Sequence, residues 1–387
     1  MSYEFDLTLN HLTNGAYRWA QPEGRQDVLG MGTADMDFMC PPAVREANLK
    51  VAEENTFNYR AKSQEYYDAI IDLYKRFYDL DIKKEWINNI PCTLAILRML
   101  FDMIGNPGDY VLMQTPYFAP IRNCIEGAGR KFLENPMILK DGRYELDLVD
   151  FERKITTYKP SVFMMVNPQN PTGRVFTQSE LENMVDICER NNVLIISDEV
   201  HCFITYDGNH HIPILKVSEK AQKISIQLFS LSKGYNMMSL PHAMTVIANP
   251  ELQKRWLGYL FSYDFHYATN SFAMASVTAA AREGDAWLKE CTAYLQQNME
   301  KFLRFVEENQ IPIKPLRPEA SYLLWIDCRE SGIAPEALGQ AFLDRAGISL
   351  NSGLDHGSNG SGFVRLNFAV THEIMDKALV RIKAMFE

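Results

Sequence analysis

The sequence predicts an α/β protein: a large domain with a mostly parallel sheet flanked by helices, and a smaller α+β domain beside it. Three observations lead to this prediction. Short apolar runs alternate with helical patterns through the middle of the 387-residue chain. These runs are apolar at nearly every position, as expected for strands covered on both faces. The last third changes to one long helical stretch followed by well-separated strand patterns.

Five apolar runs are expected to form the central strands, and they read DYVLMQ (109–114), SVFMMV (161–166), VLIIS (193–197), SIQLFS (225–230) and AMTVIA (243–248). Between the second and third runs, Thr177 and Glu180 have the spacing of a capping box, and the apolar residues that follow recur on one helical face. Strand, helix and strand in succession form the unit of a parallel sheet with right-handed crossovers.

The last third is expected to hold a helix, two strands and a closing helix, over 285–309, 322–327, 362–368 and from about 373 onward. We expect residues 45–285 to form the large domain. Residues 1–44 and 286–387 are expected to pack together as the small domain.

The composition excludes several classes of protein. Hydrophobic residues make up 47% of the chain, enough for a sizeable core and too many for disorder. The net charge of −10 and the absence of a long basic run argue against a nucleic-acid groove. The N-terminus lacks the apolar region of a signal peptide, and no run approaches the roughly 18 apolar residues of a membrane helix. The seven cysteines are scattered without a CxxC pair, so we expect buried thiols in a reducing cytoplasm.

Polar, chemically capable segments follow three of the expected strands. They are NPQNPTGR after 161–166, DEVH after 193–197 and LSKGYN after 225–230. Taken singly, each has an ordinary structural explanation, as turns, a helix cap or a solvated lysine. Chemistry in open α/β sheets lies beyond the carboxyl ends of the strands, so three such ends together indicate a site.

Lys233, Asp198 and Asn170 in these segments suit pyridoxal phosphate. A lysine can form a Schiff base with the cofactor aldehyde. An aspartate can keep the ring nitrogen protonated, and an amide can donate to the phenolic oxygen. Ser230 and Ser232 offer hydroxyls to the phosphate.

The segments NPQNPTGRVF, SDEVH and SLSKGYN resemble the three signature segments of the class I/II pyridoxal-phosphate-dependent aminotransferases of fold type I. Four further segments are similar to the cystathionine β-lyase branch, the MalY/PatB-type C–S lyases: TADMDF (33–38), EGDAWL (283–288), YLLWID (322–327) and GFVRLNFA (362–369). The resemblance covers nearly the whole chain and implies the fold type I architecture.

The resemblance also implies roles for single residues. Lys233 matches the Schiff-base lysine, Asp198 the partner of the pyridine nitrogen and Asn170 the donor to O3′. Arg365 matches the arginine that grips the substrate carboxylate with its planar fork. Phe118 matches an aromatic residue that stacks on the ring.

For the phosphate, the backbone N–H groups of Thr93 and Leu94 are expected to contribute from a helix N-terminus. Tyr59 matches a tyrosine that reaches the phosphate of the neighbouring subunit, which implies a homodimer with its active site at the interface. His201 lies where the lyase branch commonly has histidine. A contact with the cofactor and a structural role remain equal alternatives for it.

The sequence departs from the family pattern at three places. Cys92 replaces the glycine that begins the phosphate-binding turn, which restricts the loop. Gly32 and Thr33 stand where the branch usually has Trp and Val, so we expect a substrate pocket of different size. Pro241 replaces the arginine that anchors the phosphate in many aminotransferases, which favours a lyase over an aminotransferase.

No metal site is expected. The histidines of NHH (209–211) have no third ligand at a suitable spacing, so solvated loop residues are the expected interpretation.

The main functional hypothesis is α,β-elimination of cystathionine, cystine or a related S-substituted cysteine to pyruvate, ammonia and a thiol. Lys233 would hold the cofactor and then act as the base for the Cα proton. An aminotransferase acting on an amino acid and a 2-oxo acid is the first alternative, because it uses the same residues. A regulatory protein that keeps the cofactor but acts through a protein partner is the second.

Overall fold

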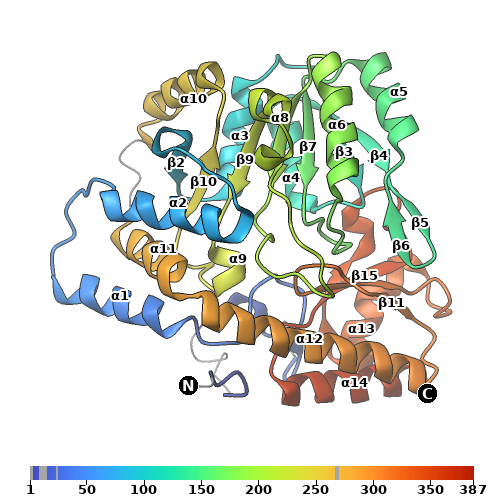
Figure 1. The fold of residues 1–387 in the computed structure, drawn as a ribbon. Coiled ribbons are helices and arrows are strands. Elements are labelled where there is room, and N and C mark those ends of the chain that lie inside the picture. Colours follow the sequence, from blue (N-terminus) through green and yellow to red (C-terminus); the bar gives the residue numbers. More distant parts are fainter. Residues whose placement is uncertain (1–2, 8–14, 23–24, 266–269) are drawn as a thin grey trace.

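Two β-sheets organise the chain (Figure 1). The computed structural model describes residues 3–7, 15–22, 25–265 and 270–387. The larger sheet contains, in spatial order, β2 (Ile87–Ile90), β10 (Ala243–Val246), β9 (Ser225–Phe229), β8 (Leu194–Asp198), β7 (Val162–Val166), β3 (Tyr110–Thr115) and β4 (Lys131–Pro136). Strand β10 is antiparallel to both of its neighbours, β2 and β9, and the other neighbouring pairs are parallel. The predicted mostly parallel sheet is therefore confirmed, and the strand expected at 243–248 runs against the others.

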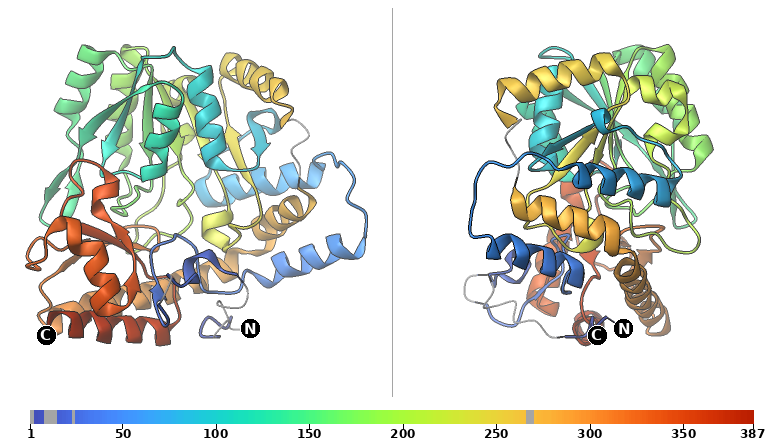
Figure 2. Two further views of the ribbon diagram at one scale, coloured as in Figure 1. Left: turned by 180° about the vertical axis from the view of Figure 1, so that it is seen from behind. Right: turned by 60° about the vertical axis from the view of Figure 1, so that its left-hand side comes forward.

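Helices cover both faces of this sheet (Figure 2). The helices of this part of the chain are α1 (Pro42–Glu53), which packs against α11, α2 (Gln64–Tyr78), α3 (Thr93–Met103), α4 (Ala119–Gly127), α5 (Leu148–Tyr158), α6 (Gln178–Arg190), α7 (Ile214–Val217), α8 (Glu219–Ile224), α9 (Ser232–Tyr235), α10 (Pro250–Ser262) and α11 (Ser271–Glu283). Val111 and Met113 of β3 join the core under α3, α4 and α10, whereas Leu112 joins the core under α5 and α6. This alternation explains the continuous apolar runs, because both faces of each strand are buried.

The predicted capping box begins α6. The Thr177 hydroxyl accepts a hydrogen bond from the Glu180 N–H at 3.2 Å, and the Glu180 carboxylate accepts one from the Thr177 N–H at 2.7 Å. Two N–H groups that the helix itself leaves unpaired are thereby satisfied.

The smaller sheet lies in the C-terminal third and is antiparallel. Its strands, in spatial order, are β11 (Lys314–Leu316), β12 (Leu323–Asp327), β15 (Phe363–Asn367) and β14 (Asn351–Ser352). The accompanying helices are α12 (Asp285–Glu308), α13 (Leu338–Ala346) and α14 (His372–Phe386). The helices and strands expected here are confirmed, whereas the domain boundaries at residues 44 and 285 stay a prediction. None of the helices in the described part of the chain is long and apolar enough to cross a membrane.

The N-terminal strap, residues 29–38, runs between the two sheets. It begins with β1 (Leu29–Gly30), which pairs in parallel with β13 (Ile348–Ser349). The Asn367 side chain donates to the Thr33 carbonyl at 2.6 Å, which fastens the strap to β15. These contacts pack residues 29–38 against the C-terminal part, whereas the assignment of all of residues 1–44 to the small domain stays a prediction.

All seven cysteines are free thiols. The prediction of burial is confirmed for four of them, Cys188, Cys202, Cys291 and Cys328. It is wrong for Cys92, which is exposed, and only partly right for Cys40 and Cys124, which are half-buried. Cys92 is exposed because it is the residue before the first turn of α3, outside the packed helix.

Candidate active site

Three strand ends of the larger sheet lie side by side and carry the candidate site. Strand β8 ends at Asp198 and lies between β7 and β9. In the register of the sheet, Asp198 is opposite Val166, the last residue of β7, and Leu228 of β9. The loop with Asn170 follows β7, and helix α9 with Lys233 follows β9. The register therefore brings the three predicted residues to one edge of the sheet.

Lys233 is half-buried, and burial of its ammonium group lowers its pKa to about 8. The negative charges of Asp35 and Asp198 oppose the shift, and the positive charge of Arg365 adds to it. Lys233 Nζ donates a hydrogen bond to the carbonyl oxygen of Ala34 in the N-terminal strap. A substantial fraction of this amine is therefore neutral near pH 8, as a nucleophile or base requires.

Asp198 is buried at the end of β8, and burial raises the pKa of its carboxyl group to about 7. The neighbouring charge of Glu199 raises the pKa as well. A hydrogen bond of 3.2 Å from the Val200 N–H and the charge of Lys233 both lower it. A carboxyl group with a pKa near 7 can pair with a ligand group that itself carries a proton.

Glu199, which the sequence analysis did not single out, anchors the backbone beside Asp198. Its side chain is fully buried. Its carboxylate accepts four hydrogen bonds, from Ser197 Oγ at 2.7 Å, His211 Nε2 at 2.8 Å, Gln227 Nε2 at 2.6 Å and the Ile214 N–H at 2.9 Å. The bonds join β8 to β9 and to the segment before α7, so they hold the strand end from which Asp198 projects. In the sequence, the two adjacent acidic residues of DEVH are the only indication of this hydrogen-bond network.

Arg365 lies in β15, is 4% exposed and forms hydrogen bonds with neutral groups. It donates to Asn170 Oδ1 at 3.1 Å, to the Gly32 carbonyl at 3.0 Å and to Asn351 Oδ1 at 2.8 Å. Its Nε has no partner, and among the described residues no carboxylate forms an ion pair with it. Burial lowers its pKa to about 10. A buried guanidinium without an anion is costly, so this position suits a carboxylate ligand.

Neutral hydrogen-bond donors gather at the same edge, and we call this group the anion cradle: the N-terminus of α3 with Ser230 and Ser232. The residue before α3, Cys92, makes no side-chain cap bond, so the N–H groups at Thr93 and Leu94 are left without a capping side chain. Strands β2 and β9, which lead to α3 and to Ser230, both flank β10 and run in the same direction. The two serine hydroxyls are 2.9 Å apart. Such a set of N–H and O–H donors suits an anion.

The remaining predicted residues of the site lie on neighbouring elements. Phe118 is half-buried directly before α4, in the loop that follows β3. His201 is buried, with its Nδ1 3.0 Å from the hydroxyl oxygen of Ser321. Burial lowers the pKa of His201 to about 3, and the charges of Lys233 and Arg365 lower it further. His201 is therefore a neutral imidazole close to both cations.

Tyr59 lies on the arm that joins α1 to α2, residues 54–63, which projects from the body of the molecule (Figures 1 and 2). It is 89% exposed. Phe57 on the same arm is 68% exposed and stacks on Phe272, with 6.1 Å between the ring centres. Two large exposed aromatic side chains on one projecting arm are typical of a surface that meets another protein.

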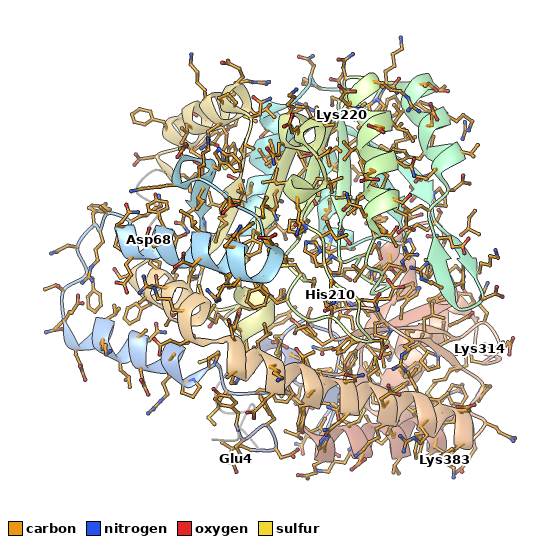
Figure 3. The ribbon with its side chains drawn as sticks, viewed as in Figure 1. Glu4, Asp68, His210, Lys220, Lys314 and Lys383 are labelled. Atoms are coloured by element: carbon orange, nitrogen blue, oxygen red, sulfur yellow. The ribbon has the colours of Figure 1, made fainter. Side chains whose placement is uncertain are left out.

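The interpretation of NHH is right for His210 and wrong for His211. His210 is exposed at the surface (Figure 3). His211 is buried and bound to Glu199, a partner that is twelve residues away and invisible to local spacing. In the described part of the chain, no cluster of three or more His, Cys, Asp or Glu side chains is arranged to hold a metal ion.

Gly32 has a role beyond the size of the pocket. A Cβ atom added there would lie 3.2 Å from Asn351 Oδ1 and 3.3 Å from Leu350 Cα. The glycine therefore allows its own carbonyl and the Asn351 side chain to reach Arg365 together. Sequence analysis missed Asn351, because only the pairing of β14 with β15 places it opposite the arginine.

Comparisons with known proteins agree with this geometry. The profile of the aminotransferase class I and II family matches residues 26–382. Cystathionine beta-lyase PatB of Bacillus subtilis is 30% identical, and the match covers 98% of this chain and 99% of that protein. Cystalysin of Treponema denticola, solved with pyridoxal 5′-phosphate, superposes with a TM-score of 0.93 at 26% identity over 100% of this chain and 99% of that one. A PLP-bound C–S lyase of Staphylococcus hominis gives 0.92 at 29% identity over 100% and 98%.

The lowered pKa of Lys233 gives a testable pH dependence. In the ligand-free chain, labelling of Lys233 by an amine-acylating reagent should rise through about pH 8, because only the neutral amine reacts. Exposed Lys220 on α8 (Figure 3), whose pKa is raised by its hydrogen bond to Asp186, should follow only at higher pH. Peptide mass spectrometry after brief labelling at a series of pH values measures both. Coincident profiles for the two lysines would contradict the description of the site.

Proposed function

The chain belongs to the aminotransferase class I and II family, and from this membership we propose that it is a pyridoxal-phosphate-dependent C–S lyase. The proposed reaction is α,β-elimination of L-cystathionine or a related S-substituted cysteine. The observation that carries the proposal is Arg365, a buried guanidinium without an acidic partner among the described residues, in the cluster that contains Lys233 and Asp198. A lyase substrate has a carboxylate to pair with Arg365 and an amine to meet Lys233.

The residues present fit pyridoxal 5′-phosphate. The anion cradle offers donors for the phosphate, with no side chain capping α3. Asp198, with its pKa near 7, suits the ring nitrogen, and Asn170 lies at the neighbouring strand end for the phenolic oxygen. Lys233 has a partly neutral amine for the aldehyde. When bound, the cofactor supplies an aldehyde that condenses with amines and a ring that withdraws electrons from the adjacent carbon.

The side chains of the protein then orient the substrate and move its protons. Arg365 binds the α-carboxylate through a planar pair of N–H donors and so fixes the direction of the Cα–H bond. Lys233, with a pKa that burial has lowered to about 8, takes the proton from Cα. Asp198 holds the proton on the ring nitrogen while negative charge develops at Cα. Burial of the site keeps water from competing for these charges.

Loss of the Cα proton allows the Cβ–S bond to break, and the electron pair of that bond leaves with sulfur. The thiolate gains a proton to become the free thiol. The remaining three-carbon unit takes up one water molecule and yields pyruvate and ammonium. Overall, one S-substituted cysteine and one water give one thiol, one pyruvate and one ammonium ion, so no second substrate is consumed.

An aminotransferase is the second candidate, because the matching family profile bears that description. Both reactions need the same residues up to removal of the Cα proton. An aminotransferase would instead release the substrate as a 2-oxo acid without breaking the Cβ–S bond, and it would need a second 2-oxo acid to accept the amino group. The lyase is preferred for two reasons. The relative from Bacillus subtilis is named a cystathionine beta-lyase, and the matching structure from Staphylococcus hominis is a C–S lyase. Both matches extend over nearly the whole chain.

We further propose that the chain acts as a homodimer in a reducing cytoplasm. The projecting arm with Tyr59 and Phe57 offers an apolar surface for a second copy. Tyr59 would then reach the phosphate bound by the partner. Seven free cysteines suit a reducing compartment.

The first test is an assay of the purified protein with L-cystathionine and no added 2-oxo acid. Pyruvate and free thiol should form together and in equal amounts, because elimination needs only water. Lys233→Ala is the control and should lower the rate by roughly a hundredfold or more, since it removes the base. A strict requirement for an added 2-oxo acid would establish the aminotransferase instead.

The second test concerns Arg365. Removal of one partner of a desolvated charge pair costs roughly 2–5 kcal/mol, so Arg365→Ala should lower kcat/KM for amino-acid substrates by a factor of roughly 30 to several thousand. Arg365→Lys should restore only part of this, because lysine supplies charge without the fork. Steady-state kinetics measure the effect, with cofactor content and melting temperature recorded alongside. A variant that loses stability or cofactor yet keeps its kcat/KM would make the arginine structural.

The third test concerns the shared site. A hydrogen bond to a charged group is worth about 1.5–3 kcal/mol, so Tyr59→Phe should weaken cofactor retention roughly tenfold to a hundredfold. Mixing Tyr59→Phe with Lys233→Ala subunits should then recover activity, because a hybrid dimer has one site with both native residues. Equal mixing should restore about a quarter of the native sites. Subunit exchange without recovery would argue against a contribution from the partner.

A further inference from the structure

Lys62 is a lysine with an unusual environment. It precedes Ser63, the N-cap of α2, and is half-buried. Burial lowers the pKa of its ammonium group. No carboxylate and no hydrogen-bond acceptor pairs with it within the ranges that the structure describes. Half-buried lysines usually find a counter-charge or extend into water, so an uncompensated one indicates an anion from outside the chain.

A cavity of about 510 Å³ is lined by Lys62, by Glu85 before β2 and by the first three residues of β2. Asn89, next to the last residue of this strand, lines the same cavity. Strand β2 leads into α3, and the first turn of that helix is part of the anion cradle. Lys62 and the strand that leads to the cradle therefore line one cavity.

A chain of contacts places Lys62 near the serines as well. Tyr66 lies one helical turn after Lys62, and its hydroxyl oxygen is 2.7 Å from Nε2 of His242. The Ser230 hydroxyl donates to the His242 carbonyl at 2.9 Å. His242 is buried. Burial is the main cause of the lowered pKa of His242, and the positive charge of Lys62 is the second cause. The helix that Lys62 precedes and the Ser230 hydroxyl thus contact the same histidine.

The anion cradle supplies hydrogen bonds but no positive charge. Its N–H groups and hydroxyls are neutral, whereas a phosphate monoester carries nearly two negative charges near neutral pH. Pro241, at the position of the anchoring arginine in related enzymes, is exposed and has no charge. Lys233 and Arg365 already donate hydrogen bonds to neutral oxygens, Lys233 to Ala34 and Arg365 to Asn170, Gly32 and Asn351.

We propose that Lys62 is the cation that neutralises the cofactor phosphate in this chain, in the place of the arginine that the sequence lacks. The inference rests on the proposed cofactor and not on whether the reaction is elimination or transamination. It assigns to the N-cap region of α2 a binding role that the sequence pattern did not indicate.

The test compares two cofactors that differ only in the phosphate. Full-length protein freed of cofactor is titrated with pyridoxal 5′-phosphate and with pyridoxal, and absorbance follows binding. Lys62→Gln should raise the Kd for pyridoxal 5′-phosphate roughly tenfold to a hundredfold, as expected for loss of a charge-assisted hydrogen bond. The Kd for pyridoxal should change by less than about twofold, because pyridoxal lacks the phosphate that Lys62 is proposed to contact. Lys62→Arg should retain most of the affinity.

Lys84→Gln is the matched control. Lys84 lines the same cavity, but its Nζ donates to Gln64 Oε1 at 2.8 Å and lies 4.6 Å from the centre of the Tyr67 ring. It should leave both dissociation constants unchanged. Equal losses for the two cofactors in Lys62→Gln, or a loss of dimer without preference for the phosphate, would overturn the inference and make Lys62 structural or an interface residue. Failure of the unchanged protein to bind pyridoxal 5′-phosphate would instead refute the proposed function.

Discussion

The site is organised by the burial of two positive charges without a carboxylate in contact. Lys233 and Arg365 are both held by neutral oxygens, and in the described residues Asp35 and Asp198 act on Lys233 only at longer range. Such an arrangement costs free energy in the ligand-free chain. The surrounding structure supplies that free energy through a sheet buried on both faces, and a ligand that brings a carboxylate and a phosphate recovers it. Buried charge without a counter-charge in the protein is typical of a binding site and not of a packed core.

The two cations come from different sheets, so the site exists only where the sheets meet. Lys233 follows β9 of the larger sheet and Arg365 lies in β15 of the smaller one. The N-terminal strap passes between them and offers one carbonyl to each, from Ala34 and from Gly32. A shift of the strap therefore changes the surroundings of both cations together.

Sequence patterns predicted what depends on short-range rules. Strands with both faces buried appear as continuous apolar runs, and the capping box of α6 depends on residues three positions apart. Roles in the site were expected where polar residues follow strands. Sequence patterns did not predict the role of a side chain whose partner is distant in the sequence. His211 depends on Glu199, and Asn351 depends on the pairing of β14 with β15. Nothing local distinguishes such residues from solvated loop positions.

The N-terminal strap has a consequence for synthesis of the chain. Its partner Asn367 lies 334 residues after Thr33, and Ile348 and Ala369 lie in the same part of the chain, so they leave the ribosome long after the strap. Both strands that present Asp198 and Lys233 can form long before that point. The nascent protein therefore passes through a stage in which the reactive lysine is placed but not yet covered. Contacts of such long sequence separation also form slowly, so closure of the strap is a late step in maturation.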